Sequence, residues 1–247
     1  MFGSPSQGKE VTFPEDCLQA TVGGGNWWIK DENSRVSAGS LAFAFAPHVD
    51  QLPYAFVPVG RKDPTVHESA IVKVTPLKVD QPLERSDLPV AAMSLREGEV
   101  WAAYRAKKRP CLVIGCDHPA VDATLTRGMP KISTAPTMLV APYYGVTRNL
   151  QRAGYRPEFV ERVRHCEYPQ YVWDNLPFAG GEESILRLDH LQPIGAHYAA
   201  CKPSGYRLSE TATGVIRELL QWLIWGGVPE DSLVALYRQE IESLLGR

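Results

Sequence analysis

Residues 98–115 read GEVWAAYRAKKRPCLVIG, in which a charged break separates two short apolar runs. The runs, EVWAAY and CLVI, are six and four residues long, and glycine, proline or charged residues bound them. This length is typical of strands and too short for most helices. We therefore expect two strands here. Similar short apolar runs elsewhere in the chain predict a mainly β protein of the α+β class.

Strand-like runs of this kind recur on both sides, at Leu41–Ala46, Tyr54–Val59, Ala70–Val74, Thr137–Ala141 and Ser184–Leu188. The segment 39–60, GSLAFAFAPHVDQLPYAFVPVG, repeats the order of glycine, strand, break, proline and strand found in 98–115. A further run ending in proline follows each segment, AIVKVTP at 70–76 and MLVAP at 138–142. Two explanations stay open: a degenerate duplication of one barrel, or unrelated hairpins, since glycine and proline bound strands in many folds.

The chain after Ser209 has helical periodicity. Ser209 suits an N-cap and Glu210 suits the positive end of a helix dipole. An apolar stripe with a period of 3.6 residues follows, formed by Val215, Ile216, Leu219, Leu220, Leu223 and Ile224. Gly226–Gly227 is expected to end this helix, and Pro229 to lie in the first turn of a second one. Its stripe is formed by Leu233, Leu236, Tyr237, Ile241, Leu244 and Leu245. The two stripes either face the core or form the interface of a homodimer.

Composition and charge exclude several classes of protein. The chain has 247 residues, of which 44% are hydrophobic, so it can bury a core and is not broadly disordered. The formal net charge is −2, so no overall positive field marks it as a nucleic-acid-binding protein. Its longest apolar helix candidate, Val215–Trp225, is far shorter than the roughly 20 apolar residues of a membrane span. We expect no membrane association.

The cysteines indicate a reducing compartment. Their number is odd, none form a C-x-x-C pair, and the initial MFGSPSQGKE lacks the apolar core of a signal peptide. They are Cys17, Cys111, Cys116, Cys166 and Cys201. His165 with Cys166, and Cys116 with His118, have the residue types of zinc ligands but not their usual spacing. We therefore expect a cytoplasmic protein without a metal or another cofactor.

Four segments and a helix occur in an informative order. EGEVWAAY at 97–104 precedes RPCLVI at 109–114, MLVAP at 138–142 and SILRLDHLQPI at 184–194, and the helix expected at Ser209–Ile224 follows. In this order they resemble the PemK/MazF-like toxins, the endoribonucleases of toxin–antitoxin pairs, over roughly residues 94–225.

The resemblance implies a small SH3-like β-barrel with a helix at its edge, often assembled as a two-fold dimer. It also implies cleavage of single-stranded RNA without a metal, in which the ribose 2′-hydroxyl attacks the adjacent phosphate. We accordingly expect a β-rich N-terminal extension at 1–93, the barrel at 94–225 and a C-terminal helix at 226–247. The extension is a candidate for a degenerate second barrel.

The expected catalytic residues follow from the same resemblance. Arg109 matches the family arginine, which supplies a cation and an acid function, and a threonine just past the third strand assists it. This chain instead has Tyr143 and Tyr144 after Pro142, and its nearest threonine is Thr147. Either Thr147 or the Tyr144 hydroxyl takes the threonine's place, or the site is inactive.

Further residues are candidates for contacts with RNA. Arg105, Lys107 and Lys108 form a cationic cluster with Arg109 that either follows an RNA backbone or is an ordinary charged surface. Tyr143 and Tyr144 suit stacking on bases or strand-end packing.

The segment similar to the family's D-Q-I contains Asp189 and His190. We expect Asp189 to be structural, gripping backbone where the barrel closes, and His190 to be a candidate proton acceptor. The segment 148–181 interleaves arginines, Arg148 among them, with aromatic residues, which suits RNA or an acidic peptide. A solvated face over packed Phe159 and Val163 is the simpler interpretation.

Two functions from different classes remain, beside a third option, a structural oligomer built through the two C-terminal helices. The first is a metal-independent endoribonuclease of the toxin–antitoxin type. The alternative is a non-catalytic barrel that acts as an RNA- or protein-binding regulatory subunit, partnered by an antitoxin or another regulatory protein. The absence of the family threonine and the near-neutral charge favour this alternative.

Overall fold

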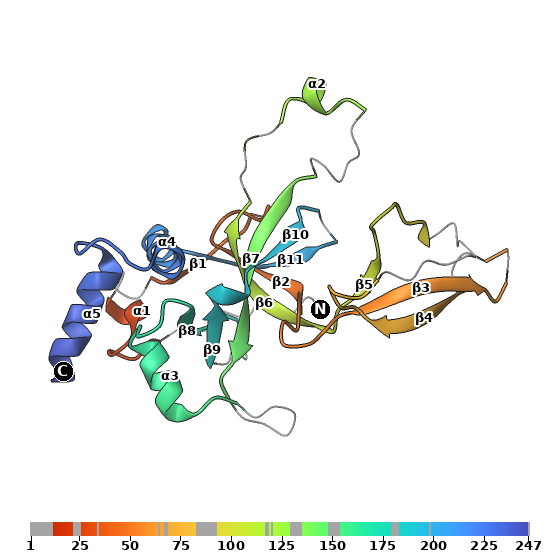
Figure 1. Ribbon diagram of the computed structural model, residues 1–247. Coiled ribbons are helices and arrows are strands. Elements are labelled where there is room, and N and C mark those ends of the chain that lie inside the picture. Colours follow the sequence, from red (N-terminus) through yellow and green to blue (C-terminus); the bar gives the residue numbers. More distant parts are fainter. Residues whose placement is uncertain are drawn as a thin grey trace, which may run out of the picture. The chain divides into compact units, whose positions relative to one another are not determined.

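The computed structural model (Figure 1) describes residues 12–21, 26–33, 35–63, 65–66, 69–82, 93–116, 119, 121–128, 135–147, 154–178, 183–197 and 199–246. The chain divides into two compact units. The main unit combines Met1–Phe45 with Lys108–Arg247, and the second unit is Ala46–Lys107. The main unit therefore draws strands both from the expected N-terminal extension and from the expected barrel range.

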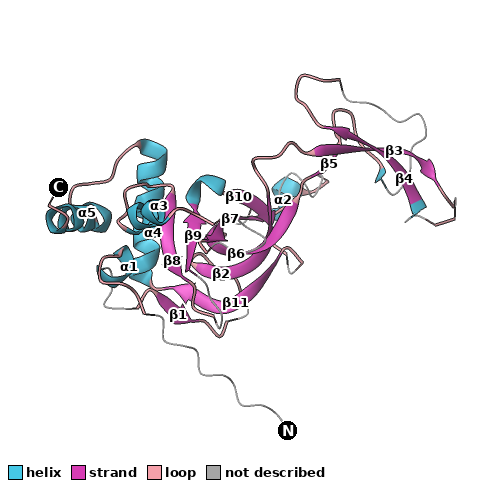
Figure 2. Cartoon of the chain, turned by 90° about the horizontal axis from the view of Figure 1, so that it is seen from below, coloured by secondary structure: helices cyan, strands magenta, loops and turns pink. Residues whose placement is uncertain are grey.

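One eight-stranded antiparallel sheet forms the main unit. Its strands are β1 (Trp28–Lys30), β2 (Ser40–Pro47), β6 (Ala106–Gly115), β7 (Thr137–Gly145), β8 (Tyr171–Asn175), β9 (Glu183–Arg187), β10 (Gln192–Gly195) and β11 (Cys201–Leu208). They follow the order β1-β11-β2-β6-β7-β9-β8, and β10 pairs with β7. The first half of β7 pairs with β10 and its second half with β9, and the sheet curls into a half-barrel (Figure 2). The expected mainly β, α+β class is confirmed.

Helices flank this sheet, and those after Ser209 follow the periodicity of the sequence. They are α1 (Leu18–Thr21), α2 (Ala123–Thr126), α3 (Pro157–Arg164), the 3₁₀ turn η4 (Leu188–His190), α4 (Glu210–Trp225) and α5 (Leu233–Leu244). The Ser209 hydroxyl caps α4 by accepting from the Ala212 amide at 3.2 Å. Gly226 ends the helix with a φ of 83°, a left-handed conformation that favours glycine.

The start of the second C-terminal helix differs from the expectation. Pro229 does not lie in its first turn, because α5 begins only at Leu233. The Ser232 hydroxyl caps the helix, and the Glu218 carboxylate accepts from the Val234 amide at 2.9 Å. Two polar acceptors thus satisfy the first free amides at this later position, while the Pro229 carbonyl closes the preceding turn.

Helices α1, α4 and α5 cover one face of the curled sheet. Side chains of alternate strand positions, such as Leu41, Leu112, Tyr143 and Leu186, form the largest core cluster together with buried residues of α1, α4 and α5. The opposite face carries two smaller clusters, one under α3 and one on β2, β6 and β7. Neighbouring residues of a strand point to opposite faces of the sheet. The face that a residue occupies therefore decides whether it can belong to the candidate site.

The second unit contains a three-stranded antiparallel sheet of β3 (Tyr54–Arg61), β4 (Ala70–Pro76) and β5 (Trp101–Ala103) in the order β4-β3-β5. The two unrelated hairpins are not formed, because β2 does not pair with β3 and β5 does not pair with β6. The described part of the second unit is this three-stranded sheet, and the duplication stays a prediction. The strands of each similar segment separate instead, with β2 and β6 in the main sheet and β3 and β5 in this one. The division is decided by which distant strands pair with one another, and short apolar runs in the sequence do not specify those partners.

Among the described residues, no helix is long and apolar enough to cross a membrane. The longest, α4, has 16 residues.

Candidate functional site

The register of β6 and β7 brings two expected catalytic residues together. Cys111 lies opposite Pro142, so the next residue of β6 on the same face, Arg109, lies opposite Tyr144. The Arg109 guanidinium carbon is 4.0 Å from the centre of the Tyr144 ring. This is a close cation–π contact, and both side chains are only partly buried. Arg109 and Tyr144 therefore form one surface-accessible pair.

A second arginine, Arg187 of β9, completes the same face. Tyr144 lies opposite Ile185, which makes Arg187 its diagonal neighbour. The Arg187 guanidinium carbon is 5.8 Å from the centre of the Tyr144 ring and 4.9 Å from that of Tyr171, its direct partner on β8. Two guanidinium groups thus contact one tyrosine ring.

The η4 turn adds a carboxylate and an imidazole to these groups. Arg187 donates to both carboxylate oxygens of Asp189, from Nε and Nη2, at 2.7 Å each. The same Nη2 lies 2.7 Å from His190 Nε2, and His190 Nδ1 lies 2.9 Å from the Tyr144 hydroxyl. Asp189 therefore grips a side chain in this structure, whereas we expected it to grip backbone.

The hydrogen bonds of His190 imply its tautomer. A guanidinium nitrogen can only donate, so Nε2 must accept from Arg187 and carry no proton. The neutral ring then has its proton on Nδ1 and donates it to the Tyr144 oxygen. Because Tyr144 accepts from His190, its own hydroxyl proton is available to another acceptor.

The charges of the cluster follow from burial and pairing. Burial raises the pKa of the Tyr144 hydroxyl more than the charges of Arg109 and Arg187 lower it, so the group stays protonated at neutral pH. Burial also raises the pKa of the Asp189 carboxyl, but its hydrogen bonds with Arg187 outweigh this and the net pKa lies below its usual value. The site thus holds an ionised acid paired with Arg187, and a neutral phenol beside Arg109.

Arg109 contributes the cation that is not taken up by a carboxylate. Within the described ranges, no ion pair links its guanidinium to an Asp or Glu, whereas Arg187 is held in a two-point pair with Asp189. A guanidinium beside a neutral hydroxyl donor suits an anion with several oxygens, such as a phosphate. We call the group of Arg109, Tyr144, Arg187, Asp189 and His190 the Arg109 cluster.

Tyr143 occupies the opposite face and is removed from the RNA-contacting candidates. Its side chain is 2% exposed, and its hydroxyl donates to Asp174 Oδ2 at 3.0 Å. Trp27 and Trp28 donate to the same carboxylate at 3.2 and 3.1 Å. A ring enclosed in this way cannot stack on a base.

The other expected site residues are dispersed. Thr147 is exposed, two residues past the end of β7, and Arg148 lies outside the described residues. Lys108 follows the alternation of β6 to the face opposite Arg109, where its amine lies 5.8 Å over the Phe43 ring. Arg105 precedes β6 and is exposed, whereas the exposed Lys107 lies on β6 two residues before Arg109 and on the same face. Tyr144 is therefore the hydroxyl-bearing residue that the structure brings to Arg109.

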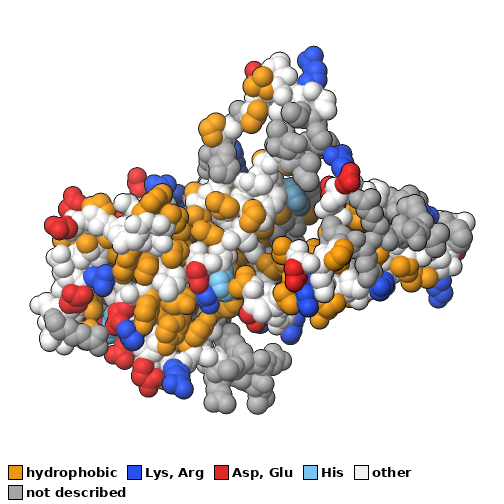
Figure 3. All heavy atoms as spheres, in the orientation of Figure 1, with side chains coloured by type: hydrophobic (Ala, Val, Ile, Leu, Met, Phe, Trp, Pro, Cys, Tyr) orange, Lys and Arg blue, Asp and Glu red, His pale blue; other side chains and the backbone are white. Residues whose placement is uncertain are grey.

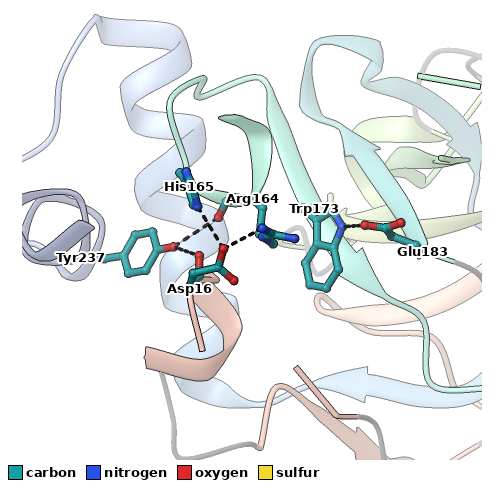
Figure 4. A network of polar contacts seen from close by, with 6 residues as sticks. All are labelled: Asp16, Arg164, His165, Trp173, Glu183 and Tyr237. Carbon is teal, nitrogen blue, oxygen red and sulfur yellow. Dashed lines mark hydrogen bonds and ion pairs between the residues drawn. The ribbon is translucent and has the colours of Figure 1, made fainter. Parts of the chain in front are cut away.

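A second polar network links helices (Figure 4). Asp16 Oδ2 accepts from Arg164 at 2.6 Å and contacts His165 Nε2 at 3.1 Å. The Tyr237 hydroxyl of α5 donates to the backbone carbonyls of Asp16 and Arg164, at 2.9 and 3.2 Å. Nearby, Trp173 donates to Glu183. These contacts tie the residues before α1, the end of α3 and α5 into one body, a structural role.

Of the two His–Cys pairs considered in the sequence, His165 with Cys166 lies in unsuitable surroundings, and His118 of the other pair lies outside the described residues. His165 is engaged by Asp16, and the adjacent Cys166 is buried, which raises the pKa of its thiol to about 12. A thiolate is the form that binds metal, so this cysteine is a poor ligand. No group of three or more His, Cys, Asp or Glu side chains within the described part of the chain has the arrangement of a metal site.

Sequence reasoning missed Arg187 and included Tyr171 only as one member of the basic and aromatic segment 148–181. The only available signal was their spacing: Arg187 precedes Asp189 by two residues in the family-like segment, and Tyr171 belongs to the basic and aromatic segment 148–181. Neither spacing reveals that Arg187 lies opposite Tyr171 and diagonal to Tyr144.

Comparison of the whole chain with protein-family models, curated proteins and solved structures finds no match.

Proposed function

We propose that the main unit is a metal-independent endoribonuclease that cuts single-stranded RNA, as PemK/MazF-like toxins do. The main support for this proposal is the contact of Arg109 with Tyr144, whose hydroxyl is hydrogen-bonded to His190. The curled antiparallel sheet with α4 packed against it supports an SH3-like barrel of that family. Within this proposal Tyr144 takes the place of the family threonine.

The reaction assigns a role to each member of the pair. The 2′-hydroxyl loses its proton and forms a bond to phosphorus, while the bond from phosphorus to the 5′-oxygen breaks and leaves a cyclic phosphate. Arg109 holds the additional negative charge of the phosphorane with its two-pronged guanidinium. Tyr144, protonated at neutral pH and with its proton available, donates to the departing 5′-oxygen.

His190 is the proton acceptor for the 2′-hydroxyl in this mechanism. Its Nε2 accepts from Arg187 in the free protein. A bound phosphate offers Arg187 a charged acceptor, which competes with the neutral imidazole for Nη2. The released Nε2 then takes the proton while Nδ1 keeps its hydrogen bond with Tyr144. Asp189 holds Arg187 in place throughout.

The alternative, a non-catalytic subunit that binds RNA or a regulatory protein, has its own supporting observation. Both ring nitrogens of His190 are engaged in the free protein, and Asp189 already occupies the fork of Arg187. Such a fully paired cluster can hold a phosphate through Arg109 without taking a proton from a ribose.

Incubation of the protein with single-stranded RNA in EDTA, followed by sequencing of the new ends, tests the proposal. We expect cleavage that leaves a cyclic phosphate. Arg109→Lys keeps the charge but loses the two-pronged contact, so the rate should fall about 10²- to 10³-fold. The control is Arg207→Ala, which removes an exposed arginine on β11, a strand that β2 separates from β6. This variant should cleave RNA at the original rate.

Two further results decide between the candidates. Tyr144→Phe keeps the ring under Arg109 and removes only the hydroxyl, so it should slow cleavage while RNA still binds. Cleavage of normal rate by Arg109→Ala would discard this mechanism. RNA binding by the original protein without any new ends would instead support the non-catalytic alternative.

A further inference from the structure

The Arg109 cluster continues into a row of aromatic rings, of which two are stacked and the others meet edge to face. Tyr171, which lies under Arg187, contacts Tyr168 with ring centres 6.0 Å apart and Phe159 with centres 5.3 Å apart. Phe159 and Tyr168 stack on each other at 6.0 Å with an interplanar angle of 29°. The Arg162 guanidinium carbon lies 5.1 Å over the Tyr168 ring. Arginines thus lie over Tyr144, Tyr171 and Tyr168, and Phe159 packs against the last two rings.

The row is accessible along its length. All four aromatic residues, Tyr144, Tyr171, Tyr168 and Phe159, are only partly buried, although three of them also pack against the smaller core cluster under α3. In Figure 3, hydrophobic side chains gather over β8 and β9 beside a histidine and charged side chains. We call this row, with Arg109, Arg187 and Arg162, the aromatic–arginine row.

The row ends in a hollow at the start of α3. The hollow has a volume of about 560 Å³ and is lined by Arg156, Pro157, Glu158, Phe159, Arg162 and Tyr168. This volume falls within the range of small-molecule sites, about 300–1,000 Å³. Its walls combine two stacked aromatic rings with two guanidinium groups, and the positive end of the α3 dipole faces it. A planar base beside a phosphate matches both kinds of wall.

One arginine of the hollow, Arg156, is the group that suits an anion. Arg162 pairs with Glu167 at 2.6 Å, so part of its charge is compensated. Arg156 is exposed, and no ion pair ties it to a carboxylate in the described part of the chain. Glu158 is the opposing charge on the hollow's lining. Two arginines therefore stand against two glutamates, Glu158 and Glu167, and Arg156 is the arginine that remains for a phosphate.

We propose that the hollow at the start of α3 is a nucleotide-binding subsite, and that the aromatic–arginine row guides single-stranded RNA between it and the Arg109 cluster. This inference rests on the proposed function in one respect, that the RNA strand runs from the hollow to the Arg109 cluster. Binding of RNA along the row does not require cleavage. Bases stack on tyrosine and phenylalanine whatever their identity, and the arginines beside the rings meet the phosphates. An acidic peptide would use the arginines and leave the stacked rings without a partner.

The test measures binding of a fluorescent, 2′-O-methylated RNA of about eight nucleotides, a length within the site sizes of single-strand-binding domains. The methyl groups remove the attacking hydroxyl, so affinity is measured without cleavage. Tyr168→Leu keeps an apolar side chain and removes the stacking surface, so affinity should fall about 5- to 150-fold. Arg156→Ala, an exposed substitution that leaves the rings in place, should weaken binding several-fold. Arg207→Ala is the matched control and should bind normally.

The outcomes separate this inference from the proposed function. Weaker binding by both variants in a protein that never cleaves RNA keeps the subsite and rejects the nuclease. Cleavage of unmodified RNA together with normal binding by both variants rejects the subsite and keeps the nuclease. Binding of a poly-glutamate peptide but not of RNA overturns the subsite. Ultraviolet crosslinking of a 4-thiouridine oligonucleotide should mark the peptides that contain Phe159 or Tyr168, and crosslinks confined to other peptides would contradict the assignment.

Discussion

Asp174 makes the stability of the main unit depend on pH in a direction opposite to that of most acidic residues. Its carboxyl is fully buried and accepts from Trp27, Trp28 and Tyr143. Burial disfavours the charged form more strongly than these three donors favour it, which raises the pKa from 3.8 to about 7. The folded protein therefore keeps a proton on Asp174 that the unfolded chain has already lost.

The sign and size of the effect follow from this difference. Below pH 3.8 both states carry the proton and the stabilising contribution is fully present. Between pH 3.8 and about 7 only the folded state binds the proton, so the free energy of unfolding falls by about 1.4 kcal/mol per pH unit. Above about pH 7 the loss is complete and amounts to about 4 kcal/mol at most.

The perturbation is Asp174→Asn, which preserves the shape of the side chain but cannot ionise. Urea unfolding is followed by tryptophan fluorescence from pH 4.5 to 8.5, with Trp27 and Trp28 as local reporters. The stability of the original protein, relative to this variant, should fall with rising pH until about 7 and then level off. The exposed substitution Asp50→Asn is the control and should show no such trend. A relative stability that rises with pH would refute the reasoning, because it would mean that the three donors outweigh burial.

Substitutions at three further positions test the local structure of the main unit by urea unfolding. Gly39→Ala places a Cβ at a φ of 84° and 3.0 Å from Thr213 Oγ1, so it should cost about 1–2 kcal/mol, and unchanged stability would contradict the strain. Ser209→Ala removes the acceptor of the Ala212 amide and should cost about 1 kcal/mol, whereas Ser209→Asp should restore most of it. Tyr237→Phe leaves two backbone carbonyls without their shared donor and should cost about 1–3 kcal/mol, and a loss below 0.5 would show that water replaces the hydroxyl.

Local properties of the chain were sufficient to predict its strands and its main helix. Short apolar runs between glycines, prolines and charges occur where the strands β2, β3, β4, β6, β7 and β9 are found. The α4 helix follows from its period of 3.6 residues, the capping serine at 209 and the glycine at 226. These signals act within one turn or one strand, so they do not depend on distant residues.

The Arg109 cluster was predictable only in part. Arg109, Tyr144 and His190 were recognised from their motifs, but Tyr143 was assigned to the same surface although it is buried. Adjacent residues of a strand point to opposite faces, and the sequence contains no sign of which face the helices cover. The packing of α1, α4 and α5 on the Tyr143 side decides this.

The sequence alone therefore specifies which segments form strands, which form helices and which residue types can bind a phosphate. These properties depend on local sterics, capping and side-chain chemistry. Pairing between distant strands decides the rest. The registers of β6 with β7 and of β7 with β9 place Arg109 and Arg187 on either side of Tyr144. Those registers depend on burying one face of the whole sheet at once, so the same pairing that completes the core also assembles the cluster on its other side.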